Sequence, residues 1–121
     1  MKHVYTGIDI IEIDRMAESI KKPGFLEKIF TKNEIALCTR KNEAEFYAGR
    51  FAAKEAIYKA LSQRAGFEKI DWLDMEILSA ENGRPVLNFL NGSIKRFENK
   101  MDISISHNKT TSVAIAVLVL S

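Results

Sequence analysis

The stretch Phe51-Ala52-Ala53-Lys54-Glu55-Ala56-Ile57-Tyr58-Lys59 lies at the centre of the longest segment with helical periodicity in the chain. Glu55 and Lys59 are four residues apart, so a helix places them on one face, one turn from each other. Spacing alone favours a solvent-exposed pair that contributes about 0.2–0.5 kcal/mol. The neighbouring residues are small and let another backbone approach the helix closely: Ala48, Gly49, Ala52, Ala53, Ala56 and Ala60.

Length and composition indicate one globular domain spanning residues 1–121, because 46% of the residues are hydrophobic and 28% are charged. The 18 basic and 16 acidic residues give a net charge of +2, too balanced to indicate a nucleic-acid partner. The single cysteine, Cys38, fits a reducing cytoplasm. Acidic residues interrupt any signal-peptide core, and no apolar run approaches the roughly 18 residues that span a bilayer. We therefore expect a cytoplasmic protein outside the membrane.

Residues 4–13 are rich in β-branched side chains and predict a strand, within which residues 7–11 place a carboxylate, Asp9, in an otherwise apolar stretch. Burying a charge costs several kcal/mol unless it is paired or binds a metal. A structural salt bridge and a metal ligand are both open interpretations of Asp9. Gly7 permits a bulge or a close approach by another group.

Capping signals predict four helices. Asp14 is placed to cap residues 15–21, a short segment follows at 25–30, and the Thr31–Glu34 capping box opens a helix that ends near Thr39. Asn42 is expected to cap the central helix over residues 43–64, with Gly66 as its stop. The buried stripe of that helix is expected to consist of Phe46, Ala53, Ile57, Ala60 and Leu61.

The second half of the chain predicts strands. Residues 72–78 and 86–89 flank the turn signal Asn82-Gly83 and predict a hairpin. Residues 90–99 are ambiguous, with Ile94 and Phe97 spaced as on a short helix. Strands are also expected at 101–106 and 111–120, and the latter is apolar on both faces, which favours a central position. The fold class is therefore α+β: a single small domain with an antiparallel-rich sheet packed on one long central helix.

Two polar features each have a structural and a functional interpretation. His107 follows a strand and enters a polar loop, where a turn residue is more common than a catalyst. Basic residues concentrate in the first third of the chain and form either a solvated face or a docking patch for an acidic partner. They are Arg15, Lys21, Lys22, Lys28 and Lys32.

Taken together, four motifs resemble the short, single-domain 4′-phosphopantetheinyl transferases, the bacterial holo-acyl-carrier-protein synthases. The resemblance runs in order along the whole chain. The motifs are residues 7–10 (Gly-Ile-Asp-Ile), residues 49–56 with the downstream Lys59, the turn Asn82-Gly83-Arg84-Pro85, and residues 104–107 (Ser-Ile-Ser-His).

The resemblance implies transfer of 4′-phosphopantetheine from coenzyme A to a serine of apo acyl carrier protein, with adenosine 3′,5′-bisphosphate released. It implies Asp9 and Glu55 as ligands of Mg²⁺, and Lys59 and His107 beside the pyrophosphate. Arg50 and the turn Asn82, Gly83, Arg84 and Pro85 are implied at the nucleotide end. The general base stays open between a carboxylate and a metal-polarised water.

The resemblance also implies a homotrimer with coenzyme A at subunit boundaries and a role in fatty acid biosynthesis. Acyl carrier proteins are acidic, so Arg15, Lys21 and Lys22 become candidate docking residues, with Arg15 foremost. Two rival classes are a non-catalytic module that binds coenzyme A or acyl carrier protein, and a small structural or regulatory domain without a ligand.

Overall fold

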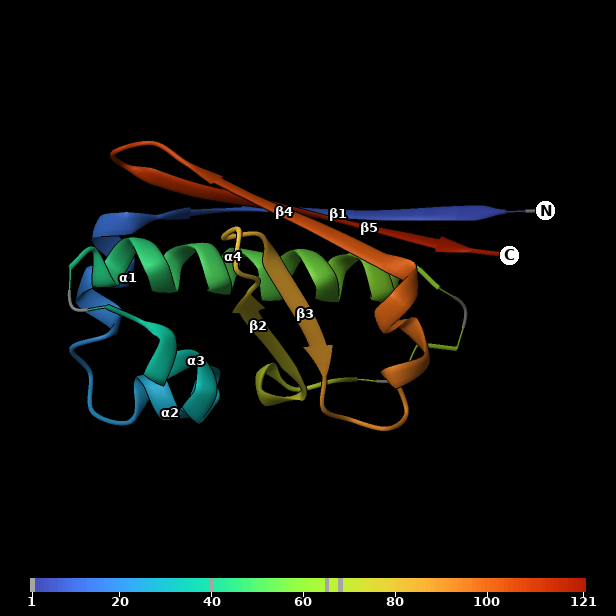
Figure 1. Cartoon of the computed structure of the whole chain (residues 1–121), viewed down its shortest axis with the longest axis horizontal. Coiled ribbons are helices and arrows are strands. Elements are labelled where there is room, and N and C mark those ends of the chain that lie inside the picture. Colours follow the sequence, from blue (N-terminus) through green and yellow to red (C-terminus); the bar gives the residue numbers. More distant parts are fainter. Residues whose placement is uncertain (1, 40, 65, 68) are drawn as a thin grey trace.

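The computed structural model describes residues 2–39, 41–64, 66–67 and 69–121. One long helix, α4 (Glu43–Ser62), runs along the length of the molecule. A three-stranded sheet covers one side of this helix, while a hairpin and the short helices α2 (Phe25–Ile29) and α3 (Lys32–Leu37) lie on the other side (Figure 1). Among the described residues, no helix is long and apolar enough to cross a membrane.

The larger sheet has the order β1-β5-β4 and is antiparallel throughout. Its strands are β1 (His3–Glu12), β4 (Met101–His107) and β5 (Thr111–Leu120). The central position of β5 confirms the prediction made from its apolar faces. Asp9 lies opposite Ala114, so β5 holds the strand that carries this carboxylate.

The predicted hairpin is confirmed as a separate two-stranded sheet of β2 (Met75–Ser79) and β3 (Pro85–Phe89). Its strand begins later than expected, because Trp72–Asp74 forms a 3₁₀ turn in which the Asp71 amide donates to Asp74 Oδ2 at 2.8 Å. Gly83 takes φ +85°, a conformation that favours glycine. Lys95–Lys100 is also a short 3₁₀ segment.

The prediction of a side-chain cap by Asn42 is wrong, although α4 does begin at Glu43. Asn42 adopts a left-handed conformation with φ 62°, and its backbone carbonyl, rather than its side chain, accepts from the Phe46 amide at 3.0 Å. The helix ends at Ser62, before Gly66 takes its left-handed φ of 74°. Gly66 therefore lies beyond the helix end.

Three short helices precede α4: α1 (Ile13–Ser19), α2 (Phe25–Ile29) and α3 (Lys32–Leu37). Asp14 lies in the first turn of α1 and not at its cap, because the helix already begins at Ile13. The Thr31–Glu34 capping box is confirmed, with both reciprocal hydrogen bonds formed at 2.8 and 3.2 Å.

Small residues on α4 let β1 approach closely, as expected. A Cβ at Gly7 would overlap the carbonyl oxygen of Ala56, so only glycine fits where the strand crosses the helix. The predicted stripe is buried at Ala53, Ile57, Ala60 and Leu61. Phe46 is the exception: it is only half-buried, and the Arg50 guanidinium lies 4.2 Å from its ring centroid.

Candidate active site

The close crossing of β1 and α4 brings three of the predicted site residues together. Lys59 Nζ donates to Asp9 Oδ1 at 3.2 Å and to the carbonyl oxygen of Ile8 at 2.9 Å. The Lys59 side chain is 49% exposed and that of Asp9 is 17% exposed, so the pair lies at the surface of a shallow site. Lys59 thus pairs with the strand carboxylate and not with Glu55, its neighbour one turn away.

The carboxylates of Asp9 and Glu55 are close enough at this crossing for the charge of one to affect the other. Burial raises the pKa of Glu55, the nearby Asp9 charge raises it further, and Lys59 opposes both effects. Asp9 Oδ2 is buried and has no hydrogen-bond partner among the described residues. A buried carboxylate oxygen without a partner is costly, so the site favours a ligand that supplies positive charge or a donor.

These oxygens suit a hard cation. Magnesium is commonly held by one or two carboxylates together with water and substrate phosphates. A closed structural metal site uses several His, Cys, Asp or Glu side chains. No group of three or more such side chains that could hold a metal ion occurs among the described residues. Asp9 and Glu55 therefore fit a cation that a substrate helps to bind.

A cavity of about 700 Å³ opens beside Glu55. Its volume is within the usual range of about 300–1,000 Å³ for sites that bind small molecules. Tyr58 from α4 and Trp72 from the 3₁₀ turn line it together with Lys28 from α2. Glu55 thus lies where a bound substrate can reach both the carboxylate pair and an aromatic wall.

Within one chain, His107 lies far from Glu55. His107 Nε2 is 3.0 Å from Glu45 Oε1, and Glu45 precedes Glu55 by ten residues, a separation of about 15 Å along an α-helix. His107 instead lines a second cavity of about 280 Å³ with Lys41 and Arg50. The predicted site residues therefore form two groups on one chain.

Arg50 is already engaged by the fold. Its Nε donates to the Ile77 carbonyl at 3.4 Å and its Nη2 donates to Ser79 Oγ at 2.8 Å. Burial lowers the pKa of the guanidinium, and the Glu34 charge opposes that effect. Arg50 thus braces β2 and borders the second cavity at the same time.

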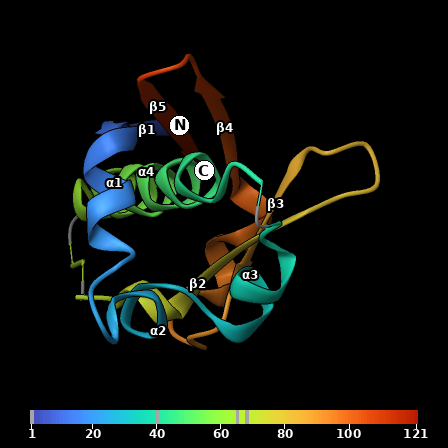
Figure 2. The same cartoon turned by 90° about the vertical axis from the view of Figure 1, so that its left-hand side faces the viewer.

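The turn Asn82-Gly83-Arg84-Pro85 also lies apart from Glu55. Asn82 Oδ1 accepts from the Arg84 amide at 3.0 Å and closes the turn. Figure 2 shows the β2–β3 turn projecting on the side of the molecule opposite α1. Any contact between this turn and the Asp9–Glu55 group requires a second chain or a ligand that spans both regions.

The candidate docking residues lie on and after α1. Arg15 is exposed and borders a cavity of about 350 Å³ that Met16, Phe25 and Phe51 also line. Lys21 is exposed and 3.5 Å from Glu18, and Lys22 is exposed. A basic side chain therefore borders an apolar hollow on this face.

Sequence reasoning missed the ion pair between Lys54 and Glu34, whose side chains are both fully buried with N–O distance 2.7 Å. A signal was present, because Lys54 precedes Ile57 by three residues and Leu61 by seven, which places it on the buried stripe. A lysine at such a position requires a buried acceptor. The Glu45 partner of His107 was also missed and had no comparable signal.

Comparison with known proteins assigns the family. Residues 5–117 match the model of the 4′-phosphopantetheinyl transferase superfamily. Holo-[acyl-carrier-protein] synthase of Clostridium novyi is 44% identical over 119 residues, covering 93% of this chain and 84% of that protein. The Protochlamydia amoebophila synthase is 48% identical over 116 residues, covering 92% and 93%.

A solved structure agrees with this assignment. The Bacillus anthracis holo-(acyl-carrier-protein) synthase in complex with CoA (3′,5′-ADP) has a TM-score of 0.80 and 36% identity, with full coverage of both chains. The family match, the two relatives and the shared fold lead to one conclusion: this chain belongs to the 4′-phosphopantetheinyl transferase superfamily.

Proposed function

We propose that this chain transfers 4′-phosphopantetheine from coenzyme A to a serine hydroxyl of apo acyl carrier protein and releases adenosine 3′,5′-bisphosphate, in the cytoplasm and for fatty acid biosynthesis. The transfer follows from the family and from relatives that are holo-acyl-carrier-protein synthases. The observation that carries the assignment of the site is the meeting of Asp9, Glu55 and Lys59 where β1 crosses α4.

The reaction is attack by an alcohol on a phosphorus of a pyrophosphate, so positioning and charge neutralisation account for most of the rate. Lys59 is half exposed and can turn from Asp9 toward the pyrophosphate, where its charge stabilises the leaving group. The serine hydroxyl would lose its proton to a carboxylate or to a metal-polarised water.

Asp9 and Glu55 would hold Mg²⁺, and their fit rests on the unpartnered Asp9 oxygen and the all-oxygen donor set. Bound there, the cation supplies positive charge to the phosphate oxygens. The carboxylates of Asp9 on β1 and Glu55 on α4 would hold it there, and their mutual repulsion would be lower with the cation bound.

We assign the nucleotide end of coenzyme A to the second group of residues, Arg50, His107 and the turn Asn82-Gly83-Arg84-Pro85, in a neighbouring chain. A homotrimer would join this group of one chain to the Asp9–Glu55 group of the next. The outer face of the larger sheet supports association, because it exposes large apolar side chains that monomers rarely leave uncovered. These are Val4, Ile8, Ile10, Ile115 and Val119, which are 38–65% exposed.

Apo acyl carrier protein would dock on the face that carries Arg15, Lys21 and Lys22. These exposed cations provide charge complementarity to an acidic partner, and the apolar hollow beside Arg15 provides contact area. This face adjoins the site, since Phe51 lines the hollow one helical turn before Glu55.

Mixing two inactive variants tests the shared site. Glu55→Gln should abolish transfer, and His107→Ala should greatly reduce it. When the two variants are refolded together, the chains pair at random. At about one subunit boundary in four, a chain with an intact Glu55 then meets a neighbour with an intact His107, so the mixture should regain about a quarter of wild-type activity. Sedimentation should show a trimer. A fully active monomer, or mixtures that stay inactive, would refute shared sites, while absence of transfer by the wild type would refute the function.

A further inference from the structure

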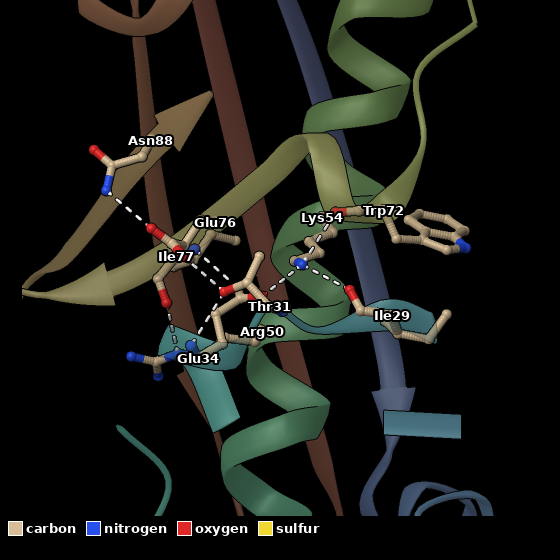
Figure 3. A network of polar contacts seen from close by, with 9 residues as sticks. All are labelled: Ile29, Thr31, Glu34, Arg50, Lys54, Trp72, Glu76, Ile77 and Asn88. Atoms are coloured by element: carbon tan, nitrogen blue, oxygen red, sulfur yellow. Dashed lines mark hydrogen bonds and ion pairs between the residues drawn. The ribbon is translucent and has the colours of Figure 1, made fainter. Parts of the chain in front are cut away.

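Lys54 is the fully buried cation of α4, immediately before Glu55 in the sequence. Its ammonium donates to Glu34 Oε1 at 2.7 Å, to the Ile29 carbonyl at 2.8 Å and to the Trp72 carbonyl at 3.1 Å. Figure 3 shows these acceptors converging on the nitrogen from three different segments of the chain. All three hydrogen-bond donors of the ammonium are therefore used.

Both carboxylate oxygens of Glu34 also have partners. Its Oε1 also accepts from the Thr31 amide at 2.8 Å, and its Oε2 accepts from the Ile77 amide at 2.8 Å (Figure 3). Thr31 Oγ1 donates to Glu76 Oε2 at 2.7 Å, which extends the network along β2. The pair thus ties α3 and the edge of β2 to the middle of α4.

Stability alone is a weak reason for such a pair. Replacing a buried ion pair by apolar side chains of similar volume is often neutral or stabilising. What an apolar pair cannot do is hold a backbone carbonyl or amide at a fixed place. The identity of the groups that Lys54 and Glu34 hold is therefore informative.

These groups belong to the surroundings of Glu55. Trp72 lines the cavity beside Glu55, and Ile29 follows Lys28, which lines the same cavity. Ile77 lies on β2, the strand that leads into the turn assigned to the nucleotide. Lys54 directly precedes Glu55 on α4. Its ammonium therefore holds the two cavity walls, at Ile29 and at Trp72, at a fixed distance from this helix.

We propose that Lys54, together with Glu34, is a positioning residue for coenzyme A: it fixes the cavity walls and the base of the β2–β3 hairpin relative to Glu55. Lys54 has no exposed surface and acts through Trp72, Ile29 and Ile77. The proposal rests on the proposed function, because it takes the transferred group to bind beside Glu55.

The double variant Lys54→Met/Glu34→Leu tests this role, since it removes both charges and keeps the volume. We expect a lower melting temperature, because the Ile29 and Trp72 carbonyls and the Ile77 amide lose these partners, and in the folded variant a fall in kcat/KM for coenzyme A of about 10- to 100-fold, the usual effect of a small misplacement. The KM for carrier protein should stay within about twofold, because among the described residues no hydrogen bond or ion pair joins Arg15, Lys21 or Lys22 to Lys54 or Glu34. Trp72 is the sole tryptophan of the chain, so its emission and acrylamide quenching should report the displaced wall.

Lys95→Met is the matched control, because it removes a surface ion pair of similar length, 2.8 Å to Glu98, and should change none of these quantities. An unchanged kcat/KM for coenzyme A in a folded double variant would show that the pair is only structural. If the double variant does not fold, Glu34→Gln decides. It keeps an acceptor for Lys54 but turns an amide donor toward the Ile77 amide, and it should raise the KM for coenzyme A without changing the carrier KM.

Failure of this proposal is distinguishable from failure of the proposed function. An inactive wild type, or full activity of Glu55→Gln, would remove the function assigned to the site. Full activity of the folded Lys54→Met/Glu34→Leu variant beside an inactive Glu55→Gln would remove only the positioning role.

Discussion

Two lysines five residues apart on α4 form two very different ion pairs. Lys54 and Glu34 lie 2.7 Å apart with no exposed surface; all three donors of the ammonium are used and both carboxylate oxygens have partners. Lys59 and Asp9 lie 3.2 Å apart with side chains 49% and 17% exposed, and one oxygen of Asp9 has no partner among the described residues.

The difference indicates which pair can bind a ligand. A saturated pair gains nothing from a new partner, whereas an unsaturated carboxylate beside a second carboxylate is stabilised by a cation. The same helix therefore carries a closed pair that holds the fold and an open pair that is available for chemistry. Four measurements test how the two pairs differ.

The largest expected effect is on stability. Lys54→Ala leaves Glu34 buried without its counter-charge and should cost about 3–5 kcal/mol of unfolding free energy. Lys59→Ala removes a partly exposed pair and should cost about 0–1 kcal/mol while abolishing transfer. Urea denaturation followed by Trp72 fluorescence measures both. Equal losses of stability would contradict the distinction between the pairs.

The second expected effect is on ligand binding. Transfer should require Mg²⁺ or Mn²⁺ and stop in a chelator. Mg²⁺ with coenzyme A at about 100 times the dissociation constant should stabilise the wild type by about 2.7 kcal/mol. Asp9→Asn should be as stable as the wild type without ligand, inactive, and shifted much less by the ligands. Severe destabilisation of metal-free Asp9→Asn would instead make Asp9 a structural ion.

The third expected effect is a pH dependence. Because the folded state raises the pKa of Glu55 above its ordinary 4.5, this group favours folding below that value and loses its contribution as pH rises through the folded pKa. Glu55→Gln should therefore raise the melting temperature of the metal-free protein at pH 7 and have less effect at pH 4. Glu81→Gln, on the exposed hairpin, is the control. If Glu55→Gln shifted the melting temperature equally at pH 4 and pH 7, the effect would not come from the raised pKa of Glu55.

The smallest expected effect comes from Arg15, an exposed charge that belongs to neither the Lys54–Glu34 pair nor the Lys59–Asp9 pair. Arg15→Glu should raise the KM for carrier protein several-fold and leave coenzyme A binding nearly unchanged, because rim charges act mainly on association. Added salt should slow wild-type transfer at low carrier concentration. A salt-independent rate with an unchanged KM would place the docking face elsewhere.

Local signals predicted the local features of the fold. The Thr31–Glu34 capping box formed as expected, because its hydrogen bonds lie within four residues. The side-chain cap by Asn42 did not form, since that residue enters the helix from a left-handed conformation. The central place of β5 was predictable from apolar residues on both faces.

Long-range relations were less accessible. The motif of Asp9, Glu55 and Lys59 predicted a shared site, but only the tertiary crossing shows that Lys59 pairs with Asp9. The separation of His107 from Glu55 depends on where β4 crosses α4, which no local pattern encodes. The double use of Arg50, as a brace for β2 and a border of the second cavity, is likewise a tertiary property.

The topology of the larger sheet has a consequence for synthesis of the chain. β1 is an edge strand that pairs with β5 in the sheet, and Asp9 lies opposite Ala114. A ribosome-bound chain that has emerged only through α4 therefore has both carboxylates but lacks the strand that holds Asp9 in register. The proposed site is therefore complete only once β5 has been synthesised and has paired with β1.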